Sequence, residues 1–408
     1  MMLAGSAVVV PSLDPLGIPG PPLLFVGLQM LTLVLHLLFM NLVVGGQVLA
    51  LVLNIAALTG RREANPMANI LYQTTPAALS MAITMGVAPL LFLQVLYGPY
   101  FYSANLLLGF AWFSLVVVLL LGFYLTYLLS LRGSNGLQKR LGRWDERPGR
   151  RLVVGLLTTA AVLWVAWILT INHELAINPK LWAQDGEWAS PRWYVPASST
   201  IPRYLHSMVG ATAIGGLWAA AIGWWRARRE TGPAEVNAAL VGFGLTAAGV
   251  LTAVQIVLGL LFLLSLDKAV FGQLMGFKGL LGSVWTIALL PAICLPVVLV
   301  YAVLRRGEFK WFVAAGGLAM VVFIGMAFGH EQVRFASLAA NSPGGFELSR
   351  WSVYPQWALM VVFLVLLVIG LGVVGVMMKW ITDRGAKGGS AGGSPTSGSS
   401  LTETPPSA

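Results

Sequence analysis

Four histidines are the residues of this sequence whose type and spacing could support redox chemistry: His36, His173, His206 and His330. Each lies in or beside a long apolar run, where ionisable side chains are costly and usually functional. Neutral imidazole is a common ligand of haem iron, and histidines at similar depth on different helices can hold haem between them. We therefore predict His36, His206 and His330 as iron ligands, with Glu331 as a rival to its neighbour His330. His173 is interpreted as a histidine that hydrogen-bonds at the membrane interface.

Two arginines accompany these histidines at a spacing of one helical turn. Arg203 precedes His206, and Arg334 follows His330. Haem carries two propionates, and arginine pairs with carboxylates through two parallel hydrogen bonds, so both arginines are predicted to bind the cofactor. The alternative is ordinary anchoring at the membrane interface. Small residues after His36 and His206 would let a flat macrocycle approach the helices, or would serve helix–helix packing instead.

The elements that must position these side chains are membrane-spanning helices. Of the 408 residues, 57% are hydrophobic and 10% are charged, whereas soluble domains have roughly 25% charged residues. A span needs roughly 20 mostly apolar residues. Because no strand-like alternation appears, the runs are predicted as helices, and the fold class is an all-α polytopic membrane bundle. The nine predicted spans are 22–57, 75–98, 103–131, 152–174, 203–226, 236–266, 279–304, 310–329 and 354–381.

The charged loops predict the orientation of this bundle. Arginines and lysines concentrate in the connections after the first, third, fifth and seventh spans, and the connection predicted at 98–103 has no charge. Lipid-embedded proteins keep such positive loops in the cytoplasm. We expect an inner-membrane protein with an external N-terminus and a cytoplasmic C-terminus. Residues 1–382 would form one haem-binding bundle, and residues 383–408, rich in Gly, Ser, Thr and Pro, a disordered tail.

Other functional classes lack their sequence signatures. The net charge of +10 is dispersed over short loops, which argues against a nucleic-acid partner. A single cysteine, Cys294, excludes a disulfide framework and covalent haem attachment. Because nearly all Asp and Glu residues are expected in loops, a proton-driven pump is not indicated, and a haem-free transporter would also lack the usual repeats.

Several short motifs resemble subunit I of the cytochrome bd quinol oxidase superfamily. Leu35-His-Leu-Leu-Phe resembles the His-x-x-Phe segment of that family, and Met85-Gly-Val-Ala-Pro its second helix. Asn178-Pro179 is similar to the loop after the fourth helix, and Arg203-Tyr-Leu-His206 resembles the Val-His-Thr haem helix. Gly329-His-Glu-Gln-Val-Arg334 stands where the family has a glutamate ligand followed by an arginine.

The resemblance implies a role for each candidate ligand. His206 would ligate the low-spin haem b, His36 a haem at the oxygen-site position, and His330 or Glu331 the intervening haem. Three departures limit the oxidase interpretation. Residues 279–304 contain no Met or His for the sixth ligand of the low-spin haem, only about 267–278 occupies the place of the large quinol loop, and 103–131 contains no glutamate for proton delivery.

The expected function is that of a haem b membrane subunit of a respiratory oxidoreductase. It would hold one to three haems b, or another haem type at one site. It would move electrons between membrane quinol and a partner at the outer face, either a cytochrome c or a partner membrane subunit. The alternatives are a divergent terminal oxidase that reduces oxygen and a haem-free membrane transporter.

Overall fold

Long helices account for almost all of the structure, which is a computed structural model. It describes residues 10–12, 15, 17–131, 148–184, 187–188, 194–195, 197–277, 279–305 and 307–390. The long helices are α1 (Pro22–Leu58), α2 (Ala64–Leu108), α3 (Phe110–Ser130), α5 (Pro148–Ile177), α6 (Thr200–Arg228), α7 (Ala234–Ser265), α9 (Gly279–Leu304), α10 (Phe309–Asn341) and α11 (Trp357–Ser390). The short elements are α8 (Lys268–Leu274), two 3-10 turns (Pro179–Leu181 and Leu348–Arg350), and the antiparallel hairpin of β1 (Ala183–Gln184) and β2 (Glu187–Trp188).

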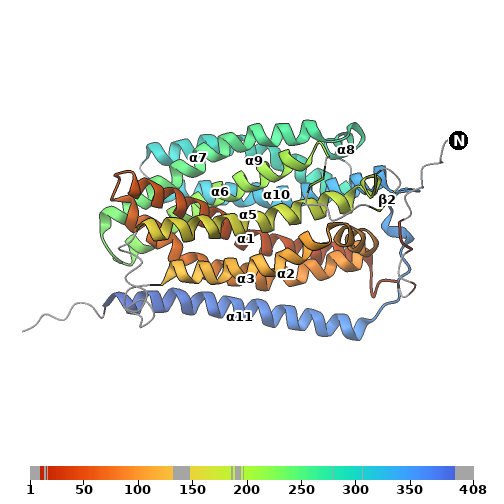
Figure 1. Ribbon diagram of the computed structural model, residues 1–408, viewed down its shortest axis with the longest axis horizontal. Helices are drawn as coiled ribbons and strands as arrows, with labels where there is room; N and C mark the ends of the chain where they lie inside the picture. The colour runs from red at the N-terminus through yellow and green to blue at the C-terminus, as the bar shows by residue number, and fades with distance from the viewer. Residues whose placement is uncertain are drawn as a thin grey trace, which may run out of the picture.

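Within the described residues, nine helices are long and apolar enough to cross a membrane. They run along one axis of the molecule, so the connections gather at two ends (Figure 1). The hairpin end holds β1, β2 and α8. The basic end holds Arg61, Arg62 and the turns after α6 and α9, which include Arg229 and Arg305. The predicted all-α membrane bundle is confirmed.

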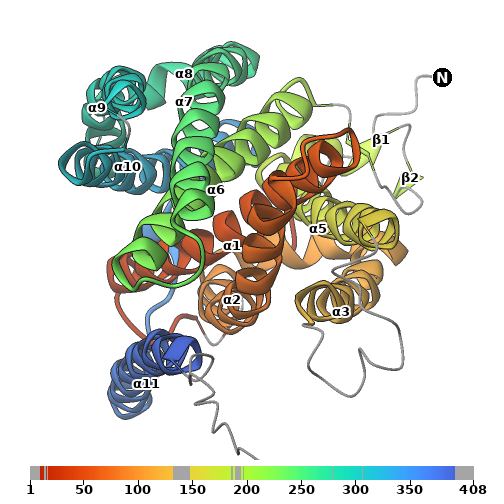
Figure 2. The same cartoon turned by 90° about the vertical axis from the view of Figure 1, so that its left-hand side faces the viewer.

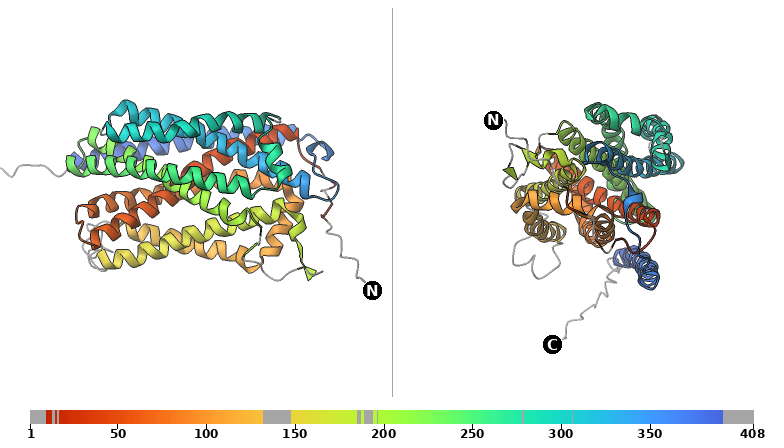
Figure 3. Two further views of the ribbon diagram at one scale, coloured as in Figure 1. Left: turned by 90° about the horizontal axis from the view of Figure 1, so that it is seen from above. Right: turned by 90° about the vertical axis from the view of Figure 1, so that its right-hand side faces the viewer.

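The helices of the bundle form two groups on either side of a central pair. Viewed along the axis, α1 and α6 lie at the centre, with α7, α9 and α10 on one side and α2, α3 and α5 on the other (Figure 2). From above and from the opposite end, the same two groups are visible (Figure 3). α11 lies at the margin beside α2 and touches the core through Phe363, whose ring meets Phe92 edge-on at 5.3 Å.

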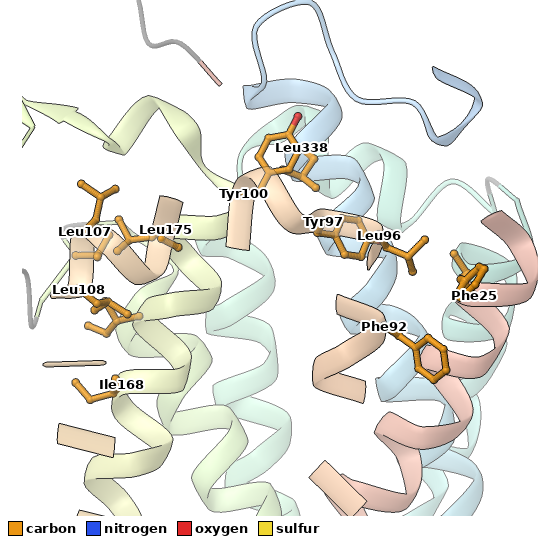
Figure 4. Close-up of a cluster of buried hydrophobic side chains, with 14 of the residues drawn as sticks. Phe25, Phe92, Leu96, Tyr97, Tyr100, Leu107, Leu108, Ile168, Leu175 and Leu338 are labelled. Atoms are coloured by element: carbon orange, nitrogen blue, oxygen red, sulfur yellow. The ribbon is translucent and has the colours of Figure 1, made fainter. Parts of the chain in front are cut away.

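The largest apolar core joins α1, α2, α5 and α10 near the hairpin end. Figure 4 shows Phe25, Phe92, Tyr97 and Leu338 converging there from three of these helices. Burial of such side chains contributes roughly 1.5–3 kcal/mol each in water, but lipid tails are equally apolar. Close packing, rather than removal from water, must therefore hold these helices together.

Several boundaries differ from the sequence prediction: α2 begins at Ala64 rather than residue 75, and α3 begins at Phe110 rather than residue 103. Residues 98–103 are not a loop, because α2 continues to Leu108 through a kink at Tyr97 (φ −131°, ψ 23°). Pro99 explains the kink, since its ring removes one helical hydrogen bond and crowds the preceding turn. α10 extends to Asn341 instead of ending at residue 329, and α11 ends at Ser390 instead of residue 381. Residues 391–408 lie outside the described residues.

Candidate functional site

His36 lies alone on α1, facing α2. Its Nδ1 is 2.9 Å from the carbonyl oxygen of Ala82. A carbonyl only accepts hydrogen bonds, so Nδ1 must donate, and the lone pair of the neutral ring is left on Nε2. Gly86 provides the room, since a Cβ there would stand 2.8 Å from the His36 ring. Histidine ligands of metals are commonly fixed by such a second hydrogen bond.

His173 and His330 form a pair, although they come from different helices, α5 and α10. Their ring centroids are 4.5 Å apart with an interplanar angle of 34°. Both histidines are half-buried, and the atoms Nε2 of His173 and Nδ1 of His330 are buried without a hydrogen-bond partner among the described residues. The sequence predicted His330 as a site residue at the end of its helix. The structure instead places it inside α10 and adds His173, which had been assigned to the interface.

Two buried ion pairs lie beside this histidine pair. Glu174 Oε1 is 2.5 Å from Arg203 Nε, and Glu331 Oε2 is 3.1 Å from Arg334 Nη1. Ser199 also donates a hydrogen bond to Glu174, at 3.0 Å. Both arginines lie close enough to act electrostatically on both imidazoles. Because each arginine has a carboxylate partner, the interpretation of Arg203 and Arg334 as simple interface anchors is incomplete.

Tyr97 connects the α2 kink to this cluster. Its hydroxyl donates to Glu331 Oε1 at 2.5 Å, and the Arg334 guanidinium lies over its ring, 4.9 Å from the centroid. Glu331 is therefore held by a hydrogen bond at Oε1, from Tyr97, and by an ion pair at Oε2, with Arg334, although Oε2 has no hydrogen-bond partner among the described residues. The kink thus lies at the residue of α2 whose phenol meets a carboxylate of α10.

His206 faces α7 rather than the histidine pair. Its Nε2 lies 3.2 Å from the amide nitrogen of Gln255, and its Nδ1 has no hydrogen-bond partner among the described residues. The imidazole ring stacks with Phe262, with 6.1 Å between the ring centroids. The Arg203 guanidinium carbon lies over the same phenylalanine ring, 4.7 Å from its centroid. Phe262 thus connects His206 to the Glu174–Arg203 ion pair.

A polar cavity of about 110 Å³ opens beside the Glu174–Arg203 pair at the hairpin end. Its wall includes the hydroxyls of Ser198, Ser199 and Ser337 and the carboxylate of Asp267. Pockets for drug-sized ligands are about 300–1,000 Å³, so this cavity is too small for a macrocycle. It can hold several water molecules, each of which needs about 10–15 Å³.

The site residues fit haem in their chemistry. Imidazole nitrogens without partners, at His173, His206 and His330, are ligands that iron accepts. Arg203 also keeps a buried Nη2 without a hydrogen-bond partner among the described residues, beside its ion pair with Glu174, and a propionate would satisfy it. In the described part of the chain, no group of three or more His, Cys, Asp or Glu side chains could hold a bare metal ion.

Glu174 and Tyr97 are the site residues that sequence reasoning missed. Acidic residues were expected in loops, yet Glu174 and Glu331 are both inside helices and buried. One signal was available: Glu174 closes one span and Arg203 opens the next, so the hairpin connection can bring the two charges together. Tyr97 had no such signal, because its role depends on the kink.

The comparisons with known proteins place this geometry in a known architecture. No protein-family model and no curated protein sequence matches the chain. A chain of the bd oxidase from Geobacillus thermodenitrificans has a similar structure, with a TM-score of 0.71 and 14% sequence identity. The similarity covers 90% of this chain and 99% of that one. The protein is therefore a multi-pass membrane bundle with the distant but recognisable fold of cytochrome bd oxidase.

Proposed function

We propose that the protein is a haem b subunit of a respiratory membrane oxidoreductase, passing electrons between membrane quinol and a redox partner at the outer face, such as a cytochrome c. The observation that carries the proposal is the set of buried imidazole nitrogens without partners, beside two buried arginines. The bd-like fold supports it. Haem, when bound, supplies one-electron redox chemistry.

Different side chains would bind different parts of the one to three haems. His36, His206 and His330 would ligate iron, while Arg203 and Arg334 would bind propionates and the glutamates would neutralise the arginines. Between the rivals at one haem, His330 is favoured over Glu331. Glu331 is held by a hydrogen bond from Tyr97 to Oε1 and by an ion pair of Oε2 with Arg334, whereas Nδ1 of His330 is a buried neutral nitrogen; Oε2 and Nδ1 both lack a hydrogen-bond partner among the described residues.

The proposed orientation puts the hairpin end outside the cell and the basic end in the cytoplasm of an inner membrane. Arginines of the turns at the basic end support it by the positive-inside rule. His173, His206 and His330 would then lie toward the outer face, where an external cytochrome c or a partner membrane subunit could exchange electrons. His36 would lie about 20 Å along α1, nearer the membrane centre.

A divergent terminal oxidase is the second candidate, because the similar solved structure is a bd oxidase. The absence of Asp and Glu from α3 weakens the oxidase candidate, because oxygen reduction consumes protons and acidic side chains would be needed to deliver them. Anaerobic mixing of the purified protein with a short-chain quinol tests the shared part of both proposals. Haem reduction is expected. Reoxidation by added cytochrome c but not by oxygen would support the relay, and the opposite pattern would support the oxidase.

Substitutions should separate His330 from Glu331. His330→Ala is expected to remove about one haem equivalent from the purified protein, because the iron loses its ligand. Glu331→Gln should keep the haem content, since glutamine preserves the shape and the Tyr97 contact. Pyridine haemochrome titration, with size-exclusion chromatography to confirm folding, measures both. Loss of haem in Glu331→Gln with full occupancy in His330→Ala would assign the iron to the carboxylate instead.

A further inference from the structure

Aromatic rings hold several of the cations at the basic end of the bundle. The Arg228 guanidinium lies over the rings of Trp224 and Phe309, 4.6 Å and 5.0 Å from their centroids. These two rings come from α6 and α10, and their centroids are 4.1 Å apart. The next residue, Arg229, lies over the ring of Trp225 at 5.3 Å. The end of α6 thus carries two neighbouring arginines on aromatic supports.

The turn between α9 and α10 carries further cations of this kind. The Arg305 guanidinium lies 5.2 Å from the ring centroid of Tyr301, and its Nη2 donates a hydrogen bond to the Tyr301 hydroxyl at 3.0 Å. Lys310 lies over the ring of Trp311 at 5.9 Å. The carboxylate of Glu308 pairs with Lys310 at 3.2 Å and also acts electrostatically on Arg305. The charges of this turn are therefore partly compensated within the protein.

The two arginines of α6 lack such compensation. Neither Arg228 nor Arg229 has a carboxylate within ion-pair distance among the described residues, and both are exposed. An aromatic face attracts a guanidinium without taking up its outward N–H donors. Those donors can therefore meet an anion that arrives from outside the protein. Guanidinium groups bind phosphate through two parallel hydrogen bonds, so adjacent arginines favour a phosphate group.

Exposed apolar side chains continue from these cations toward the middle of the bundle. They are Val300 and Leu304 on α9, and Phe309 and Val313 on α10. A free inorganic anion would leave this apolar surface uncovered, whereas the acyl chains of a phospholipid would contact it. Basic pockets between membrane helices are known to bind the headgroups of acidic phospholipids. The order of charge outside and apolar surface inside therefore matches a phospholipid better than a free ion.

We propose that the basic end binds an anionic phospholipid, whose phosphate is held by Arg228 and Arg229 and whose acyl chains lie against α9 and α10. A lipid with a net negative charge is preferred, because the ammonium group of a zwitterionic headgroup would be repelled by the arginines. Since the Arg228 contacts join α6 to α10, the bound lipid should also stabilise the packing of these two helices. The inference goes beyond the proposed function and does not depend on haem.

Titration of lipid into delipidated protein in a neutral detergent tests this site. Dioleoylphosphatidylglycerol is expected to raise the midpoint temperature of thermal unfolding, and native mass spectrometry should show it bound. Dioleoylphosphatidylcholine should raise that temperature much less. Arg228→Gln is expected to weaken the apparent affinity for phosphatidylglycerol about fivefold, the contribution of one arginine near an anionic lipid surface. Arg228→Lys should weaken it less, because the charge remains while the planar fork is lost.

Arg62→Gln is the matched control, because it removes the same charge from an exposed residue at the same end that lies over no aromatic ring among the described residues. It should keep the wild-type affinity, and an equal loss would overturn a defined site in favour of attraction to the whole charged end. If Arg228→Gln does not fold, Arg229→Gln decides, with weakened binding expected and wild-type affinity overturning the site.

Two further outcomes would overturn the lipid as the ligand. Equal stabilisation by phosphatidylcholine would show that the negative charge is not recognised. Equal stabilisation by inorganic phosphate, compared with potassium chloride at the same ionic strength, would show a site for a free anion instead. These measurements report lipid binding alone, so their failure would leave the proposed function standing, and a protein without haem would leave the lipid site standing.

Discussion

Glu174→Ala is expected to destabilise the protein by about 3–5 kcal/mol, the usual cost of removing one partner from a buried ion pair. The pair qualifies because the Arg203 and Glu174 side chains are only 9% and 2% exposed. Alanine would leave the guanidinium buried without its carboxylate and Ser199 without its acceptor. Equilibrium unfolding in mild detergent, followed by tryptophan fluorescence, measures the loss.

The double variant and an exposed pair provide the controls. Glu174→Leu combined with Arg203→Leu should be more stable than Glu174→Leu alone, because no charge is left buried without compensation. Glu347→Ala breaks an exposed pair with Arg350, where the side chains are 63% and 53% exposed, and should change stability little. A similarly small effect of Glu174→Ala would mean that water reaches the Glu174–Arg203 pair freely.

Gly215→Ala is expected to destabilise the protein by about 1–3 kcal/mol or more through overpacking. A Cβ at Gly215 would stand 2.5 Å from the Cα of Gly45 and 2.6 Å from its carbonyl carbon. These are backbone atoms of α1, which cannot rotate away, so α1 and α6 would have to separate. His36 lies on α1 and His206 on α6, and the same substitution should therefore also reduce haem occupancy.

Gly242→Ala is the matched control on α7. An added Cβ there meets nothing within 4 Å, and alanine is about 0.5–1 kcal/mol better than glycine inside a helix. It should leave the protein as stable as wild type or slightly more so, with unchanged haem. Equal behaviour of the two variants in thermal unfolding and haem titration would show that the close α1–α6 approach is not required.

The sequence was sufficient to predict the bundle but not all of its helix ends. Spans such as 279–304 coincide with α9 because their apolar runs end in charge. α10 was cut at residue 329, since hydropathy treats Glu331 and Arg334 as loop charges. Their ion pair at i,i+3 spacing and the hydrogen bond from Tyr97 to Glu331 compensate these buried charges, and α10 continues to Asn341. The contact with Tyr97 is the part that no local pattern reveals.

The sequence predicted which residue types form the candidate site, but not which of these side chains contact one another. Residue type and position in or beside the apolar runs identified the histidines, and their spacing of one helical turn identified the arginines. The pairing of His173 with His330 depends on how α5 packs against α10, and the contact of Tyr97 with Glu331 depends on a proline kink. Such contacts join residues far apart in the chain, beyond the reach of helical spacing.

The central claim, that this bundle binds haem b through its histidines, is tested most directly by a reduced-minus-oxidised visible spectrum of protein purified from haem-replete cells. Wild type should show haem b bands, and His36→Ala and His206→Ala should each lose or alter a distinct part of them while remaining folded. A well-folded, colourless wild-type protein would contradict the account and leave a haem-free membrane transporter as the better explanation of the bundle.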